Sequence, residues 1–336
     1  MHEPSRTTQP SNVGAAGVGA PDPSKSVHKV RPQSLARYAQ RVWPRVAAAL
    51  VLVFTLRWSG LVESLVFYVP SRNNDPTPPG AEEVWITTPD GVKLHGWFVR
   101  AADAAPGEKR PAVLHCHGNA GNIADHLGFS QFLTQRGMHV LIFDYRGYGE
   151  SDEDHYLTRA KLRVDSLAAF DYLASRPDVD ATNIGVYGVS LGGGFALRVA
   201  AERPNAKCVC TLAGFSSWPG VASDHVPVLG RWLIAGSLEP REAAEKLGDR
   251  AYLVVHGTRD GIVPPRHAGV LEAAAKAAGT PVAKIMIDGA AHNDIIEFEA
   301  TRRAIGDFFA SRLGAGSGAL APALTTPSPV AAHPSR

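Results

Sequence analysis

The chain has 336 residues, 45% of them hydrophobic and 20% charged, a composition that fits one globular domain of about 200 to 250 residues with extensions at its ends. Its 34 basic and 32 acidic side chains leave a net charge of +2, without the single-sign surface that nucleic-acid binding usually needs. The three cysteines, Cys116, Cys208 and Cys210, lack the spacing of zinc ligands and lie in apolar runs. We therefore expect no nucleic-acid partner, no metal site and no disulfide framework.

Both ends of the chain are predicted to be disordered tails. Residues 1–45 form a basic tail that begins with a stretch rich in Pro, Gly, Ser and Ala, and residues 314–336 are rich in the same four residue types. Such sequences bury too little apolar surface to offset the entropy that ordering costs.

A candidate membrane anchor follows the N-terminal tail at residues 46–69. The residues before it include Lys and Arg but no Asp or Glu after Asp22, and they lead into the apolar run Val46–Leu56. Eleven helical residues reach only about 16 Å, roughly half of the hydrocarbon thickness, so a spanning helix must extend further and include Arg57 and Glu63. The basic flank predicts a cytoplasmic N-terminus and an extracytoplasmic location for the rest of the chain.

Two alternatives to this anchor were weighed against the sequence. A cleaved signal peptide is disfavoured, because the residues after Leu56 read RWSGL and contain no A-x-A-like cleavage site. The second alternative is an amphipathic helix that packs on the folded domain of a cytoplasmic protein, and the sequence leaves it open.

From residue 81 to residue 313, short β-branched runs alternate with helical patterns. An antiparallel hairpin is predicted at residues 84–88 and 92–99, joined by a Pro-Asp-Gly turn. Buried strands are predicted at residues 112–116, 139–143, 183–187, 207–212, 252–255 and 282–287, and helices at residues 123–135, 159–174, 191–201, 266–278 and 294–312. This alternation predicts an α/β fold whose mostly parallel central sheet is covered on both faces, with ligands bound at the carboxyl ends of the strands.

The motif Gly188-Val189-Ser190-Leu191-Gly192 lies directly between a predicted strand and a predicted helix. A strand-to-helix turn this tight leaves no room for side chains two residues before and two residues after the serine, and glycine stands at both positions. Ser190 is therefore the candidate nucleophile, and the positive end of the following helix would stabilise negative charge that develops beside it.

A serine nucleophile of this type needs an acid and a histidine base further along the chain, in that order. Asp260 follows the strand at residues 252–255, and His292 follows the strand at residues 282–287, so both lie in loops at the same sheet edge as Ser190. These three residues are the predicted catalytic triad. Asp288 also ends a strand and is the second candidate for the acid.

The oxyanion hole is predicted from two backbone N–H groups. In this kind of site one comes from the loop after an early strand and the other from the residue after the nucleophile, which here are Asn119 and Leu191. His117 in the same loop is expected to shape the loop, and Asp144 and Arg146 are expected to have structural roles. The chain has no dinucleotide-binding, phosphate-binding or metal-ligand motif, so no cofactor is expected.

At these residues the chain resembles the α/β-hydrolase superfamily over about residues 81–313. The segments HGNAGN, DYRGYGES, GVSLGG, HGTRDGIVP and GAAHND are similar to a membrane-anchored branch of serine hydrolases that includes protein depalmitoylases, lysophospholipases and peptidase-like proteins. Members of this branch commonly carry a hydrophobic segment before a Phe/Tyr-x-Pro element, similar to Tyr68-Val69-Pro70 here. The resemblance implies the triad Ser190, Asp260 and His292 and a serine-hydrolase mechanism.

Residues 215–247 are predicted to form a small lid, because about 33 residues are too many for a simple connection. The lid is rich in apolar side chains, which either cover an acyl-binding site above Ser190 or pack down on the sheet. We expect a serine hydrolase that cleaves small-molecule or lipid-like carboxylic esters or thioesters. The alternatives are a serine peptidase or aminopeptidase and a catalytically silent binding protein.

Overall fold

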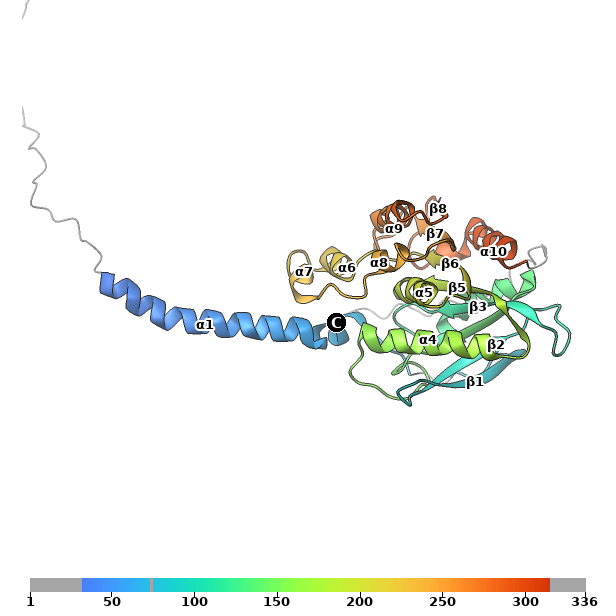
Figure 1. The fold of residues 1–336 in the computed structure, drawn as a ribbon, viewed down its shortest axis with the longest axis horizontal. Helices are drawn as coiled ribbons and strands as arrows, with labels where there is room; N and C mark the ends of the chain where they lie inside the picture. The colour runs from blue at the N-terminus through green and yellow to red at the C-terminus, as the bar shows by residue number, and fades with distance from the viewer. Residues whose placement is uncertain (1–31, 73–74, 315–336) are drawn as a thin grey trace, which may run out of the picture. The chain divides into compact units, whose positions relative to one another are not determined.

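The computed structural model describes residues 32–72 and 75–314, and the chain divides into two compact units, Met1–Val51 and Leu52–Arg336 (Figure 1). Residues 1–31 of the predicted N-terminal tail and residues 315–336 of the predicted C-terminal tail lie outside the described residues.

Helix α1 spans Pro32–Ser59. Its part from Gln40 to Ser59 is long and apolar enough to cross a membrane, and no other helix in residues 32–72 or 75–314 passes the same test. The helix begins before Val46, so the assignment of residues 32–45 to a disordered tail is wrong. Proline is tolerated in a first helical turn, and the Ala, Leu, Arg and Gln residues that follow Pro32 favour a helix.

The apolar helix ends at Ser59 rather than continuing to Val69. Gly60 has a φ of +76°, a left-handed conformation that ends the helix, and a separate short helix, α2, spans Leu61–Phe67. The anchor predicted at residues 46–69 therefore extends too far.

The side chain of Glu63 explains why residues 61–69 belong to the second unit. It is buried, and its carboxylate accepts hydrogen bonds from Nε of Arg159 at 2.8 Å and from the hydroxyl of Tyr68 at 2.7 Å. A carboxylate with these partners is satisfied inside a protein core and would be costly in a bilayer.

Within the described residues, eight strands form one sheet in the order β1-β2-β4-β3-β5-β6-β7-β8. The strands β1 and β2 are antiparallel to each other, β2 is antiparallel to β4, and all other neighbours are parallel. The bounds are β1 Ala81–Thr87, β2 Lys93–Val99, β3 Arg110–Cys116, β4 His139–Phe143, β5 Val179–Val189, β6 Ala206–Leu212, β7 Ala251–Gly257 and β8 Val282–Ile287. The predicted hairpin and mostly parallel sheet are confirmed.

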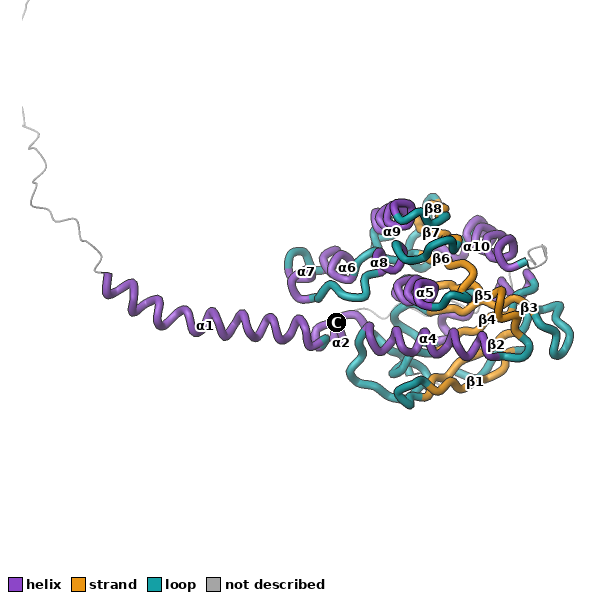
Figure 2. Tube along the Cα trace, viewed as in Figure 1, coloured by secondary structure: helices purple, strands orange, loops and turns teal. Residues whose placement is uncertain are grey.

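Helices cover both faces of the sheet (Figure 2). Side chains alternate along each strand, so β5 sends Val186 into one apolar core and Tyr187 into the other. The helices of the second unit beyond α2 are α3 Ile123–His126, α4 Arg159–Ser175, α5 Leu191–Glu202, α6 Trp218–His225, α7 Leu229–Leu233, α8 Pro240–Ala244, α9 Arg266–Ala277 and α10 Glu299–Leu313.

Two predicted helices are interrupted. The helix expected at residues 123–135 is instead α3 followed by 3-10 turns at Leu127–Phe129 and Gln131–Arg136, and Gly128 within this stretch weakens a continuous α-helix. The last helix starts at Glu299, because Phe298 adopts an extended conformation after a short 3-10 turn.

Candidate active site

Ser190 lies in a sharp turn between strand β5 and helix α5. Its φ of +51° falls in the left-handed region that residues with side chains rarely adopt. A Cβ atom on Gly188 would lie 2.3 Å from the carbonyl oxygen of Gly192, and a Cβ atom on Gly192 would lie 2.0 Å from the carbonyl oxygen of Cys116. These two approaches explain why the turn needs glycine on both sides of Ser190.

Three side chains form one hydrogen-bonded line at the carboxyl edge of the sheet. Nε2 of His292 lies 3.0 Å from Oγ of Ser190, and Nδ1 of His292 lies 2.7 Å from Oδ2 of Asp260. They come from the loops that follow β5, β7 and β8, which are parallel neighbours or near neighbours in the sheet. The structure thus brings together the serine, histidine and aspartate that the sequence analysis selected.

The Asp260 carboxylate is held in its ionised form by several donors. Its Oδ1 atom accepts hydrogen bonds from the backbone N–H groups of Ile262 at 3.0 Å and Val263 at 2.8 Å. Burial by itself would raise the pKa of Asp260, but hydrogen bonds from His256 and His292 outweigh burial and keep the pKa well below its usual range. Asp260 can therefore orient His292 and stabilise a positive charge on it.

His256 is a site residue whose role the sequence analysis missed. Its Nε2 atom lies 3.2 Å from Oδ2 of Asp260 and 2.8 Å from the carbonyl oxygen of Val263, and its side chain is buried. The signal in the sequence is its position four residues before Asp260, at the end of β7.

The two residues predicted to form the oxyanion hole lie beside Ser190. Asn119 and Leu191 both line the same pocket as Ser190. The side-chain oxygen of Asn119 accepts hydrogen bonds from the backbone N–H of Val69 and the hydroxyl of Tyr148, each at 3.0 Å, which fixes the loop that carries the Asn119 backbone. Leu191 begins helix α5, where the first N–H groups have no partner within the helix.

Three residues considered alongside the site have other partners. Nδ1 of His117 lies 2.8 Å from the carbonyl oxygen of Gly118, and burial lowers the pKa of His117 well below its usual value. The Arg146 guanidinium donates to the buried carboxylate of Asp165. The carboxylate of Asp288 accepts a hydrogen bond from Thr258 at 3.1 Å.

An apolar pocket of about 350 Å³ opens next to Ser190. It is bounded by helices α6 and α7 of the predicted lid, by α2 and by the loop after β7. Its polar side chains are Ser190, Asn119 and His225, and the rest of its lining is apolar or glycine. The apolar side chains of the predicted lid, residues 215–247, divide between the two predicted roles, because Trp218 is buried in the core whereas Val226 and Leu233 line the pocket.

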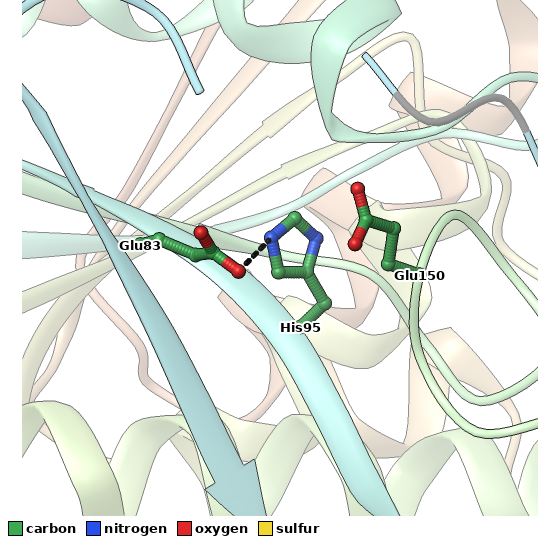
Figure 3. A group of neighbouring side chains, drawn as sticks. All are labelled: Glu83, His95 and Glu150. Carbon is green, nitrogen blue, oxygen red and sulfur yellow. Dashed lines mark ion pairs between the residues drawn. The ribbon is translucent and has the colours of Figure 1, made fainter. Parts of the chain in front are cut away.

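One group of side chains away from this pocket has the composition of a metal-binding cluster. Glu83 on β1, His95 on β2 and Glu150 after β4 offer ligand atoms that lie within 4.8 Å of one another (Figure 3). Nε2 of His95 lies 3.7 Å from Glu83, and its Nδ1 atom lies 3.6 Å from the carboxylate of Asp144. None of these residues lines the pocket at Ser190. The expectation that the protein has no metal site stays a prediction.

Comparisons with known proteins place the chain in a family. The sequence profile of the prolyl oligopeptidase family matches residues 128–313, more than half of the chain. The Mycobacterium tuberculosis protein MT2364 is 34% identical over 264 residues, which cover 76% of this chain and 89% of that protein. The Arabidopsis thaliana alpha/beta hydrolase domain-containing protein WAV2 is 31% identical over 212 residues, which cover 58% of this chain and 67% of WAV2.

The fold agrees with these matches. The solved structure of the Pyrococcus furiosus esterase Pf2001 is similar with a TM-score of 0.63 at 21% sequence identity, over 74% of this chain and 99% of the esterase. The predicted resemblance to the α/β-hydrolase superfamily is confirmed. The chain belongs to the prolyl oligopeptidase family of the α/β-hydrolase superfamily.

Proposed function

We propose that the protein is a serine hydrolase that cleaves carboxylic esters or thioesters through an acyl-enzyme intermediate. The observation that carries this proposal is the continuous hydrogen-bonded line from Ser190 through His292 to Asp260. A serine hydroxyl is a weak nucleophile by itself, and a histidine within hydrogen-bonding distance supplies the base that it needs.

In the proposed reaction Oγ of Ser190 attacks the acyl carbon while Nε2 of His292 takes the hydroxyl proton. The N–H groups of Asn119 and Leu191 bind the negative oxygen of the tetrahedral intermediate. His292 then protonates the leaving alcohol or thiol, and a water molecule activated by the same imidazole releases the acid from Ser190. Asp260 holds the imidazole in the orientation that both halves of the reaction need.

The pocket supports an apolar acyl group as the part of the substrate next to Ser190. Its volume of about 350 Å³ lies at the lower end of the roughly 300 to 1,000 Å³ of small-molecule sites, and its lining is mainly aliphatic and aromatic. Burial of an acyl chain there would contribute roughly 0.8 kcal/mol for each methylene group.

A serine peptidase is the second candidate, because the family profile is that of prolyl oligopeptidases. The same triad cleaves amides, so the triad geometry does not separate the two activities. Recognition of a free peptide N-terminus would need an acidic partner for the ammonium group, and no Asp or Glu lines the pocket in the described part of the chain. This lining favours esters and thioesters over aminopeptidase substrates.

We also propose that helix α1 anchors the protein in a membrane. The region Gln40–Ser59 has the length and composition of a single span. Arg41 and Arg45 lie toward its N-terminal end, so the basic flank supports a cytoplasmic N-terminus and an extracytoplasmic catalytic unit. Protease treatment of sealed vesicles that contain the protein tests this orientation. Digestion of the catalytic unit by a protease on the cytoplasmic side would show that the protein has the opposite orientation.

The activity is tested with a panel of p-nitrophenyl esters, acyl-CoA thioesters, lysophospholipids and aminoacyl amides. We expect turnover of esters or thioesters by the wild-type protein and none above background for Ser190→Ala. Turnover of the amides alone would favour the peptidase. If no substrate is turned over in a Ser190-dependent way, the remaining alternative is a catalytically silent binding protein.

A further inference from the structure

We propose that the lid docks on the membrane surface and that the pocket receives the apolar acyl chain of a lipid ester from the bilayer. This inference rests on the proposed hydrolase function for the fate of the substrate, but the docking itself does not depend on catalysis. It is carried by an apolar rim, which we define as Val226, Val228, Leu229, Trp232 and Ile262.

The apolar rim is exposed at the mouth of the pocket. Trp232 is 67% exposed and Leu229 is 58% exposed on the short helix α7. Val226 and Ile262 line the pocket and are still 44% and 43% exposed, so the rim continues directly into the pocket lining. Clustered exposed apolar side chains of this kind mark a surface that contacts an apolar partner.

The rim is joined to the last turn of the candidate membrane helix. A guanidinium nitrogen of Arg57 donates hydrogen bonds to the carbonyl oxygens of Arg231, at 3.0 Å, and Trp232. Arg57 lies two residues before the end of α1 at Ser59. If α1 crosses the bilayer, Arg57 lies near the boundary between the hydrocarbon layer and the lipid headgroups. Its contact with α7 then holds α7 at this boundary.

A buried ion pair fixes the lid to the segment that follows α1. Arg159 pairs with Glu63 on α2, and it also donates to the carbonyl oxygens of Ala235 at 3.0 Å and Ser237 at 2.9 Å in the lid. Its guanidinium group lies 4.7 Å from the ring centroid of Trp218. These contacts resist tilting of the lid away from the end of the anchor.

The charge of this surface favours a lipid bilayer as the occupant. The segment from Val226 to Leu233 carries one charged side chain, Arg231, and no carboxylate. Together with Arg57 it places two guanidinium groups beside the apolar rim, a combination that suits phosphate headgroups above a hydrocarbon layer. An acyl chain can then pass from the bilayer along Val226 into the pocket, where its ester meets Ser190.

The docking is tested on the full-length protein reconstituted in phosphatidylcholine vesicles that contain phosphatidylglycerol. The fluorophore NBD is attached to the introduced cysteine of Trp232→Cys. The matched control is Trp85→Cys on edge strand β1, because Trp85 is also an exposed tryptophan. The native cysteines are buried and leave the introduced thiol as the accessible one. We expect blue-shifted emission at position 232 and strong quenching by spin-labelled lipids, with neither effect at position 85.

Equal quenching at the two positions, or a protein that does not bind the vesicles, would overturn the docking. Energy transfer between labels on separate copies, without lipid quenching, would assign the rim to a second copy of the chain instead. Because these measurements involve no turnover, a protein without hydrolase activity would still give a clear answer.

The substrate part is tested by comparing p-nitrophenyl palmitate dissolved in vesicles with soluble p-nitrophenyl butyrate. We expect Trp232→Ser to lower turnover of the vesicle-borne ester about tenfold, because it removes an interfacial aromatic anchor, and to change turnover of the butyrate less than about twofold. Trp85→Ser should leave both activities unchanged. An equal loss on both esters, or no loss on the palmitate, would contradict the proposal.

Discussion

The Nε2 atom of His292 lies 3.0 Å from the Oγ atom of Ser190, although the two residues are 102 positions apart in the chain. Strands β5 and β8 bring the two loops to one edge of the sheet, with β6 and β7 between them. The sheet topology therefore places a base beside a hydroxyl that the strained turn at Ser190 presents.

The proposed role of Asp260 as the acid of the triad is tested by Asp260→Asn. An amide in this place removes the charge that stabilises protonated His292 and can favour the wrong imidazole tautomer, so we expect kcat to fall about 10⁴-fold. Asp288→Asn is the matched control, because Asp288 also ends a strand but accepts its hydrogen bond from Thr258. Steady-state kinetics of ester hydrolysis measure both variants, and a larger loss for Asp288→Asn would reassign the acid.

The turn at Ser190 is tested by Gly192→Ala. The new Cβ atom would lie 2.0 Å from the carbonyl oxygen of Cys116, so the backbone must shift, and we expect a loss of about 3 kcal/mol in the free energy of unfolding together with loss of activity. Gly269→Ala in helix α9 meets no atom within 4 Å and should instead stabilise by about 0.5 to 1 kcal/mol. Urea unfolding in mild detergent measures the free energy of unfolding of both variants. A Gly192→Ala variant with wild-type stability would show that Gly192 does not pack closely against Cys116.

The buried contact between α2 and α4 is tested by Glu63→Ala. This change leaves the buried Arg159 guanidinium without its carboxylate, and we expect a loss of about 3 to 5 kcal/mol in the free energy of unfolding. Glu299→Ala breaks an exposed pair with Arg303 and should cost less than about 1 kcal/mol. Similar small losses for both variants would mean that residues 61–67 do not pack in the core.

The stability of the region beneath the lid should depend on pH through His267. Its imidazole is buried between Ser216 and Asp224, and burial, followed by the charge of Arg266, lowers its pKa to about 4. The folded protein then binds this proton less tightly than the unfolded chain. The stability that neutral His267 contributes is therefore complete above about pH 6.5 and is lost as the pH falls toward 4.

We expect His267→Gln to flatten the fall in the free energy of unfolding between pH 6.5 and 4, by up to about 3 kcal/mol at the acidic end. The control is His155→Gln, because the His155 side chain is 92% exposed. Urea unfolding at a series of pH values measures the slope, and an unchanged slope in His267→Gln would show that another group is responsible.

Local patterns in the sequence are sufficient to predict most of the strands and to select Ser190, Asp260 and His292, which the structure brings together. The central strands are mainly apolar runs, whereas β8, which was predicted to be buried, contains Lys284 and is a partly exposed edge strand. The glycines around Ser190 are required by close approaches of the neighbouring backbone. The order of the chain then placed Asp260 and His292 at the same sheet edge, because parallel strands end on one side.

The features that the sequence analysis missed depend on partners that are distant in the chain. Local hydrophobicity places Glu63 in the predicted membrane segment, because it does not reveal the partner Arg159, which lies 96 residues further along the chain. The role of His256 is not predicted from the sequence, since its contact with Asp260 depends on how the loop after β7 turns back. The helix at residues 123–135 was predicted from its apolar spacing alone, which does not register the effect of Gly128.

The most direct test of the central claim is to label the full-length protein with a fluorophosphonate and to map the modified residue by mass spectrometry. We expect a single adduct on Ser190 in the wild-type protein, much slower labelling in His292→Ala, and no adduct in Ser190→Ala. An adduct on another residue would contradict the account. So would labelling of Ser190→Ala to the same extent as the wild-type protein.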